Sequence, residues 1–327
     1  MKTKFYGVIS PFITPFKEDY SLDLEAVRWL ARFQAERGVH GIFPNSTTGE
    51  FVHLSREESL EVTRVVLEEV GGKVWVIPGI SANYTEDSIA LGKSFRDMGV
   101  TGAVVTPPFF FKVSGERLKK HFSAILEKVD LPIIIYNIPS TTGINIPVAL
   151  LHELAKEYSN LAGAKATVES FTYFRQLVQL VKADRRDFAV LTGLDDLLLP
   201  VLMMGGDGGI MALANVAPQI HRAVYDAYTS GDLNRAIQEW RRLLKLVQVY
   251  DYATSFPTAV KTLLKVLNAP VKPYARMPLT PEPRETEEKN SKASERAGLD
   301  YLKIFFLSLL TPRQNIEESY RNTSSIL

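Results

Sequence analysis

The sequence predicts an α/β fold: a closed (β/α)8 TIM barrel with a C-terminal helical extension. Three observations support this prediction. Short, almost continuously apolar runs alternate with amphipathic helical patterns, the alternation repeats eight times, and after the eighth repeat only helical patterns follow. Apolar runs without in–out alternation are typical of parallel strands covered on both faces. Eight repeats favour a barrel over the alternative, an open doubly wound sheet.

The predicted strands are short, and five of the eight carry polar residues at their carboxyl ends. They cover residues 6–13, 41–46, 74–81, 102–108, 132–139, 161–167, 188–193 and 208–215.

The segments between the strands have the start and stop patterns of helices. Residues 23–38 place apolar side chains at helical spacing and end on Gly38. Ser55 stands three residues before Glu58, which predicts a capping box, and that helix is expected to close at Gly71. Residues 85–99 and 114–129 follow the same pattern.

We expect three parts along the chain. Residues 1–218 form the barrel, and residues 219–300 form a C-terminal helical region packed on it. Residues 301–327 are an extension of unknown structure. Its apolar patch, residues 304–310, is far shorter than the roughly 20 residues needed to span a bilayer.

Composition excludes several classes of function. A net charge of +1 gives no electrostatic reason to expect a nucleic acid or membrane partner. The absence of cysteine excludes disulfides, thiolate metal sites and a cysteine nucleophile. The five histidines show no metal-ligand spacing, so we expect no metal. The N-terminus shows no signal peptide, and we expect a cytoplasmic protein.

The run GGDGGI, residues 205–210, superficially resembles a phosphate-binding loop. We favour a different interpretation, in which it is a tight turn into the eighth strand at the opposite end of the barrel from the active residues.

One lysine stands inside an apolar strand. Lys165 lies in NLAGAKATVES, residues 160–170, whereas most other lysines lie among charges on predicted helix surfaces. A buried ammonium is costly unless it is paired, neutralised or used. Burial lowers the pKa of a lysine, and a neutral amine attacks a carbonyl to form a Schiff base. The pattern leaves two interpretations open: a covalent catalyst, or a snorkelling or ion-paired structural lysine.

Active residues of such barrels lie at the carboxyl ends of the strands. The polar residues at those predicted ends include the run NSTTGE (45–50), Tyr136, Asn137, Lys165, Thr167, Thr192, Asp195, Asp196 and Asn215. A tyrosine beside an imine can transfer protons, and hydroxyls with backbone N–H groups can bind a carboxylate.

Several motifs in one register carry a family resemblance over residues 5 to about 300. They are GIFPNSTTGEFVHLS, VTPPFFFKVS, YNIPSTTG, AGAKATV, LTGLDDLLLP, GGDGGIMALANVAP and FPTAVKTLLKVLNAP. The chain resembles the dihydrodipicolinate synthase / N-acetylneuraminate lyase superfamily of pyruvate-dependent class I aldolases. It looks most like a member that acts on 2-keto-3-deoxygluconate.

The resemblance implies roles for the catalytic residues. Lys165 matches the lysine that condenses with the ketone of pyruvate or another 2-oxo acid, so no cofactor is needed beyond this covalent Schiff base. Tyr136 matches the tyrosine that shuttles protons, and Thr48 matches the hydroxyl residue that joins this relay. The family also implies a homotetramer.

The resemblance also implies binding residues for the pyruvyl group. Thr47 and Thr48 match the hydroxyl pair that binds its carboxylate, and Gly193 and Ile210 match backbone positions that line its pocket. Glu50 matches a glutamate for which we favour a structural hydrogen-bonding role over direct catalysis.

Two positions depart from the pattern of dihydrodipicolinate synthases. Thr141 stands where those enzymes usually have an arginine that binds the carboxylate of the aldehyde substrate, and a hydroxyl cannot replace a bidentate guanidinium. Those enzymes also use a tyrosine that is presented across a subunit contact, and Phe110 is the residue of this chain that aligns best with it. Both differences alter the half of the site that meets the second substrate, and we expect Thr141 to contact sugar hydroxyls there.

The favoured function is therefore cleavage of a 2-keto-3-deoxy sugar acid, such as 2-keto-3-deoxygluconate, to pyruvate and an aldehyde. The alternative is a 4-hydroxy-tetrahydrodipicolinate synthase that condenses pyruvate with aspartate semialdehyde. N-acetylneuraminate lyase and dehydratase variants also stay open, and a non-catalytic binding barrel is the interpretation from another class.

Overall fold

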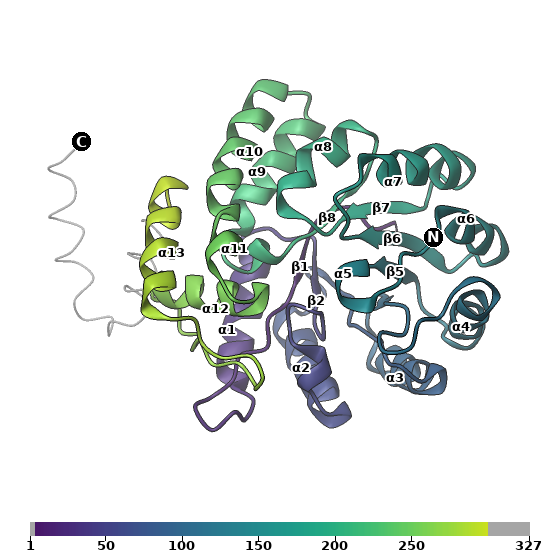
Figure 1. The fold of residues 1–327 in the computed structure, drawn as a ribbon, viewed down its shortest axis with the longest axis horizontal. Helices are drawn as coiled ribbons and strands as arrows, with labels where there is room; N and C mark the ends of the chain where they lie inside the picture. Colours follow the sequence, from purple (N-terminus) through teal and green to yellow (C-terminus); the bar gives the residue numbers. More distant parts are fainter. Residues whose placement is uncertain (1–3, 300–327) are drawn as a thin grey trace, which may run out of the picture.

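The computed structural model describes residues 4–299 and shows a parallel sheet curled into a barrel, with helices around it (Figure 1). Each predicted strand is present, and each is shorter than its apolar run. The strands are β1 (Gly7–Pro11), β2 (Gly41–Phe43), β3 (Trp75–Val76), β4 (Ala103–Val105), β5 (Ile133–Asn137), β6 (Leu161–Ala166), β7 (Ala189–Thr192) and β8 (Gly208–Ile210).

The sheet closes on itself. Its order is β3-β2-β1-β8-β7-β6-β5-β4, and the two end strands meet through a parallel bridge between Gly79 and Val104. The N–H of Ile80 donates to the carbonyl of Val104 (2.9 Å), and the N–H of Val104 donates to the carbonyl of Pro78 (3.0 Å). The predicted closed barrel is confirmed, and the doubly wound alternative is wrong.

β3 is the shortest strand because Pro78 and Gly79 interrupt it. Proline has no N–H to donate to a neighbouring strand. Gly79 allows a close approach, since a Cβ there would lie 2.2 Å from the carbonyl oxygen of Asn45. This approach brings the end of β3 against the loop that follows β2.

Helices cover the outside of the barrel. They are α1 (Leu24–Glu36), α2 (Arg56–Val70), α3 (Thr85–Met98), α4 (Gly115–Lys128), α6 (Val148–Glu157), α7 (Phe171–Gln176) and α8 (Leu198–Met203), while the short α5 (Pro139–Thr142) directly follows the carboxyl end of β5. The capping box of α2 is confirmed, because the Ser55 hydroxyl accepts from the N–H of Glu58 while the Glu58 carboxylate accepts from the N–H of Ser55. Gly71 ends α2 in the left-handed conformation that glycine favours.

Strand alternation decides which side chains face the barrel interior. On β5, Ile133 and Ile135 pack in the outer core, whereas Ile134 and Tyr136 pack in the inner core. On β6, Ala164 and Ala166 pack in the outer core. Because successive side chains of a strand point to opposite faces, the residue between these two alanines, Lys165, faces inward.

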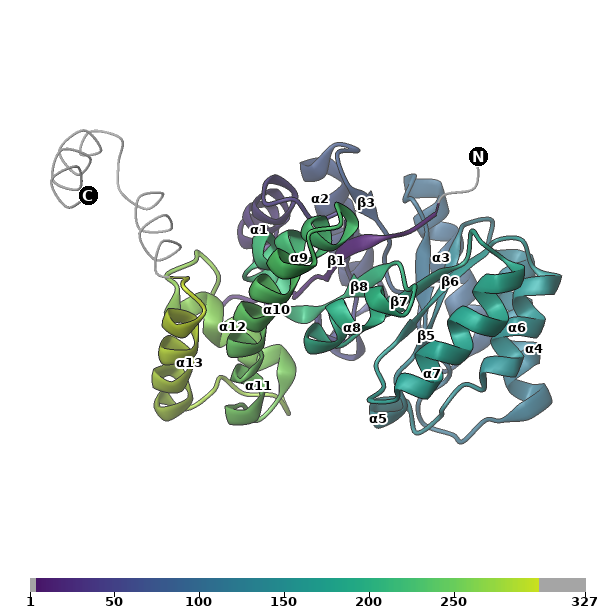
Figure 2. The same ribbon diagram turned by 90° about the horizontal axis from the view of Figure 1, so that it is seen from above.

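A further group of helices follows β8: α9 (Pro218–Thr229), α10 (Leu233–Val247), α11 (Val249–Tyr252), α12 (Phe256–Val266) and α13 (Arg284–Arg296). Figures 1 and 2 show α12 between the barrel and α13, and α12 packs against α13. The extension predicted over residues 301–327 lies outside the described residues. Within residues 4–299, no helix is long and apolar enough to cross a membrane.

The GGDGGI run forms the predicted tight turn into β8. Gly205 and Gly208 adopt positive φ angles of 95° and 148°. Asp207 between them pairs with Lys4 (3.1 Å) and Lys182 (2.8 Å). The turn precedes β8 and therefore lies at the amino-terminal end of the strands.

Candidate active site

A cavity of about 540 Å³ opens at the carboxyl ends of the strands. The strand-end residues that line it come from five strands: Pro11, Tyr136, Lys165, Gly193 and Ile210. Most residues that the sequence singled out are thus brought together in one place.

Lys165 presents its amine to this cavity from inside the protein. The residue is 3% exposed, and Nζ lies 3.9 Å from the ring centroid of Tyr136 and 5.4 Å from that of Phe43. Burial lowers the pKa of Lys165 to about 7, and the charge of Asp195 acts weakly in the opposite direction. Among the described residues Lys165 forms no ion pair, and its burial excludes snorkelling. Neither structural interpretation fits this environment.

Tyr136 stands directly beside Lys165. The two residues are register partners on β5 and β6. The Tyr136 hydroxyl lies 3.0 Å from Oγ1 of Thr167 and also bonds the side chain of Thr47. Burial raises the pKa of Tyr136 to about 12, although both hydrogen bonds act to lower it. The free site therefore holds a protonated phenol connected to two threonine hydroxyls.

Gly193 allows Lys165 and Thr167 to approach each other. A Cβ at Gly193 would lie 1.9 Å from Oγ1 of Thr167 and 3.0 Å from Cε of Lys165. Any larger residue would displace one of these side chains. Ile210 is fully buried and lines the cavity from β8.

The loop after β2 carries the two predicted carboxylate-binding hydroxyls. Thr48 is buried and lines the cavity, while Thr47 is partly buried and reaches Tyr136. The loop is held from both sides, because Gly49 donates its N–H to Oγ of Ser46 (2.9 Å) and accepts a hydrogen bond at its carbonyl from Thr14 (2.7 Å).

Comparison with known proteins decides the family. A family model described as the dihydrodipicolinate synthetase family matches residues 4–297. The chain belongs to this family. It is a carbon–carbon lyase of the dihydrodipicolinate synthase / N-acetylneuraminate lyase type, as the resemblance predicted.

Three relatives of this chain carry different names. An uncharacterized DapA-like lyase from Thermofilum pendens is 81% identical over 91% of this chain and 99% of its own. A 4-hydroxy-tetrahydrodipicolinate synthase from Chlorobium phaeovibrioides is 35% identical over 90% of this chain and 97% of its own. The probable 2-dehydro-3-deoxy-D-pentonate aldolase YjhH of Escherichia coli is 32% identical over 88% of this chain and 95% of its own.

A solved structure supports the same placement. YagE, a prophage protein of this family from E. coli K12 solved in complex with pyruvate, superposes with a TM-score of 0.88. It is 31% identical, and the match covers 90% of this chain and 99% of YagE.

Three carboxylate residues line the cavity: Glu169, Asp195 and Asp196. No arginine is among the described residues that line it. Burial raises the pKa of Asp196, and the neighbouring Asp195 carboxylate adds to the effect. Asp195 itself is buried and accepts hydrogen bonds from His221 (2.7 Å) and Tyr250 (3.1 Å).

The structure does not bring Thr141 into the cavity. Thr141 is exposed, and its hydroxyl lies 3.3 Å from the carbonyl oxygen of Ile138 within its own turn. The neighbouring Ser140 lines the cavity instead. Phe110 is 79% exposed and does not line the cavity either.

Sequence reasoning missed the contribution of the C-terminal helices. Val247, Tyr250 and Phe256 line the cavity, although they follow the barrel in sequence. They stand at no strand end, and no pattern in the sequence singles them out. Lys261 on α12 was also missed, although it is a charged residue within an apolar helical face, which is the kind of pattern that drew attention to Lys165.

Proposed function

We propose that the protein is a class I aldolase that reversibly cleaves a 2-oxo acid to pyruvate and an aldehyde through a Schiff base on Lys165. Its favoured substrate is a 2-keto-3-deoxy sugar acid such as 2-keto-3-deoxygluconate. The observation that carries the proposal is a buried amine with a pKa of about 7 that faces a buried tyrosine. A substantial fraction of such an amine is neutral near pH 7, and the neutral form can attack a ketone.

In this proposal, the lysine provides the electron sink. The Lys165 amine attacks C2 of the substrate, and Tyr136 donates its phenol proton to the carbinolamine hydroxyl, which leaves as water and gives a protonated imine beside a phenolate. Tyr136 then accepts the proton of the C4 hydroxyl, the C3–C4 bond breaks, and its electron pair forms an enamine while the aldehyde leaves. Protonation at C3 and hydrolysis release pyruvate and restore the amine. The positive imine beside the Tyr136 ring would favour the phenolate that this step requires.

The loop hydroxyls would bind the other end of the pyruvyl group. Thr47 bonds the Tyr136 hydroxyl and Thr48 lines the cavity, and these positions, with the N–H groups of their loop, support binding of the carboxylate. Gly193 and Ile210 would then enclose the methyl and methylene side of the pyruvyl group.

The acidic residues that line the cavity support an uncharged, hydroxyl-rich aldehyde. Carboxylates accept hydrogen bonds from sugar hydroxyls but repel an anionic group. Glu169 and Asp196 therefore favour a non-phosphorylated sugar acid, and Ser140 supplies a further hydroxyl. The name of YjhH, a probable aldolase for a 2-dehydro-3-deoxy-D-pentonate, points to the same substrate class.

The alternative function is 4-hydroxy-tetrahydrodipicolinate synthase. It is favoured by the relative from Chlorobium phaeovibrioides, which carries that name. Aspartate semialdehyde, however, has a carboxylate that would face Glu169, Asp195 and Asp196, and no arginine is among the described residues that line the cavity. This charge arrangement is the reason to rank the synthase second.

One experiment tests both parts of the proposal. The protein is incubated with pyruvate and borohydride and its mass is measured, with the adduct located by peptide mapping. A pyruvyl adduct on Lys165 is expected, and an unmodified protein would rule out the aldolase and the synthase alike. A panel of 2-keto-3-deoxygluconate, aspartate semialdehyde and N-acetylneuraminate then compares kcat/KM, and a preference for aspartate semialdehyde would make the synthase correct.

We also propose a homotetramer in the cytoplasm. Phe110 and Phe111 are 79% and 74% exposed, and neighbouring exposed aromatic side chains support burial against another subunit. Sedimentation equilibrium of the full chain tests this assembly, and a monomer at micromolar concentration would contradict it.

A further inference from the structure

We propose that Lys261 is a positioning residue for the carboxylate end of the substrate, acting through a buried ion pair with Glu50. This inference rests on the proposed function, because it assumes that Thr47 and Thr48 bind the pyruvyl carboxylate. It assigns a role in the active site to a helix that lies outside the barrel.

The ion pair is completely enclosed. Lys261 on α12 and Glu50 in the loop after β2 are 0% and 2% exposed, and Nζ of Lys261 donates to Oε1 of Glu50 at 2.5 Å. Nζ also donates to the carbonyl of Tyr274 (2.8 Å) and lies 4.4 Å from the ring centroid of Phe16. Taking two charges out of water is costly, so a pair of this kind is weak evidence of stabilisation by itself.

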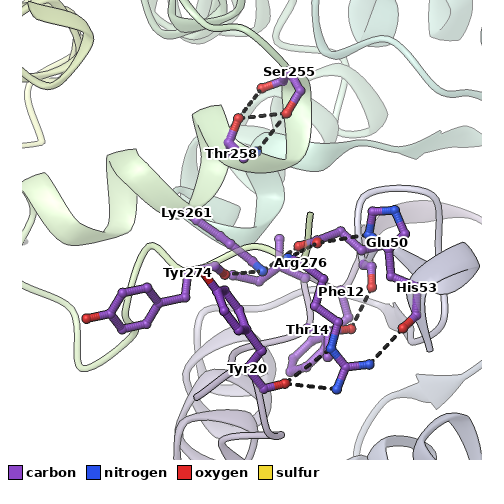
Figure 3. Close-up of polar contacts among 12 residues, drawn as sticks. Phe12, Thr14, Tyr20, Glu50, His53, Ser255, Thr258, Lys261, Tyr274 and Arg276 are labelled. Carbon is purple, nitrogen blue, oxygen red and sulfur yellow. Dashed lines mark hydrogen bonds and ion pairs between the residues drawn. The ribbon is translucent and has the colours of Figure 1, made fainter. Parts of the chain in front are cut away.

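The second oxygen of Glu50 is also held by the C-terminal region. The backbone N–H of Arg276 donates to Oε2 (3.1 Å), and Nδ1 of His53 lies 3.4 Å from the same oxygen. Figure 3 shows Lys261 reaching Glu50 and the carbonyl of Tyr274, and Arg276 beside Glu50 and His53. Both carboxylate oxygens therefore connect the loop after β2 to residues that follow the barrel.

The Arg276 side chain also joins the C-terminal region to the loop after β2. Its guanidinium donates to both carboxylate oxygens of Glu58 (2.5 and 2.7 Å) and to the carbonyls of His53 (2.7 Å) and Tyr20 (2.9 Å). The segment around Arg276 is thereby held against the start of α2 and the end of the loop.

Glu50 closes the turn that carries the two hydroxyls of the site. Its backbone has a φ of 57°, a left-handed conformation that is unfavourable for a residue with a side chain. Its N–H donates to the carbonyl of Thr47 (3.1 Å), which closes a turn over residues 47–50. Such a conformation persists only where the surroundings fix it. Without Lys261, Glu50 would turn toward water, and Thr47 and Thr48 would lose their positions.

The test measures the pyruvate concentration that gives half-maximal borohydride trapping on Lys165, together with the maximal trapping rate, in the full-length chain. For Lys261→Met, we expect half-saturating pyruvate to rise about tenfold or more, because small displacements of binding groups have large effects. The maximal rate should stay within about threefold of the parent value, since Lys165 and Tyr136 keep their contacts.

Lys182→Met is the matched control. Nζ of Lys182 pairs with Asp207 at 2.8 Å, and this partly buried pair lies at the opposite end of the barrel. We expect the control to lose stability without a change in half-saturating pyruvate. A matching rise in the control would overturn the inference, because it would show that destabilisation alone is responsible.

A double variant covers the case in which Lys261→Met leaves an unpaired carboxylate and fails to fold. Glu50→Gln combined with Lys261→Met removes both charges, which proteins tolerate better than the loss of one. The folded double variant should still need about tenfold more pyruvate. Parental half-saturation in this variant would overturn the inference. Failure of the parent itself to gain mass would instead overturn the proposed function, so the two failures are distinguishable.

Discussion

Lys165 and Tyr136 are register partners on adjacent parallel strands, and the lysine amine lies 3.9 Å from the centroid of the tyrosine ring. Both side chains face the barrel interior, where burial lowers the pKa of the amine to about 7 and raises the pKa of the phenol to about 12. The pair thus combines a nucleophile that is available at neutral pH with a proton carrier that is protonated until the imine forms. The relationship follows from strand order, since β5 and β6 are neighbours in both sequence and sheet.

Replacing Lys165 by methionine removes the nucleophile with little change in volume. We expect no mass gain with pyruvate and borohydride, and a fall in kcat for aldol cleavage of at least about 10³-fold. The fold should be retained or stabilised, because a buried amine is replaced by an apolar side chain. Intact-mass spectrometry and circular dichroism check both parts. An unchanged adduct in this variant would show that another amine forms the Schiff base.

The pH dependence of trapping reports the protonation of Lys165. The folded-state pKa is lowered from 10.5 to about 7, so the neutral amine accumulates as pH rises. The rate of trapping at low pyruvate should therefore rise through about pH 7 and level off above it. A rate that kept rising to pH 10 would show that the amine is not perturbed.

The same shift in pKa has a consequence for stability. Between about pH 7 and 10.5 the unfolded chain holds a proton that the folded chain has lost, so the free energy of unfolding rises with pH. Below pH 7 both states are protonated, and the cost of the buried charge is fully present. The contribution of this one fully buried group is up to about 1.4 kcal/mol per pH unit within that window. Denaturant unfolding should therefore show the parent gaining stability relative to Lys165→Met across that window, because the variant lacks this contribution.

Gly193→Ala tests the space shared by Lys165 and Thr167. The added methyl would overlap Oγ1 of Thr167, which also bonds Tyr136, so the lysine stem and the relay would both shift. We expect a fall in the trapping rate of about 10²-fold with the fold intact. Gly231→Ala is the control: its Cβ would meet open space, and its positive φ makes it cost stability but not activity. Equal losses in the two variants would contradict a local effect.

The sequence predicts the features that depend on local pattern. Apolar runs predict the strands, and capping residues such as Ser55 predict the helix ends. Lys165 stands between two alanines that face outward, so strand alternation predicts that its side chain faces the barrel interior. The C-terminal wall of the cavity could not be predicted in this way. The contact between Glu50 and Lys261 joins residues 211 positions apart, and it depends on how α12 returns to the barrel. No local pattern encodes that path.

Thr141 stands at the position of the family's arginine, but it is its neighbour Ser140 that lines the cavity. Both hydroxyls lie in the short helix α5, and the sequence does not determine which of two neighbours faces the cavity. Because Thr141 is exposed and bonds its own turn, Thr141→Val should leave kcat/KM for every sugar acid within about twofold. Ser140→Ala should raise KM for 2-keto-3-deoxygluconate several-fold while pyruvate trapping is unchanged. A larger effect of Thr141→Val than of Ser140→Ala would show that Thr141, and not Ser140, contacts the substrate.

Substitutions of Asp196 test whether the acidic residues of the cavity select against an anionic aldehyde. It lines the cavity beside Asp195, whose carboxylate helps to raise the Asp196 pKa. Asp196→Asn keeps the size of the side chain and removes its charge, so the KM for 2-keto-3-deoxygluconate should rise about tenfold through the loss of a charge-assisted hydrogen bond. Asp196→Arg should reverse the preference, because a guanidinium would attract an anionic aldehyde. The ratio of kcat/KM for glyceraldehyde and for aspartate semialdehyde, each condensed with pyruvate, measures this reversal. Since Lys165 and Thr48 are untouched, half-saturating pyruvate in the trapping assay should stay parental in both variants. A ratio that does not move in Asp196→Arg would show that this carboxylate does not face the second substrate.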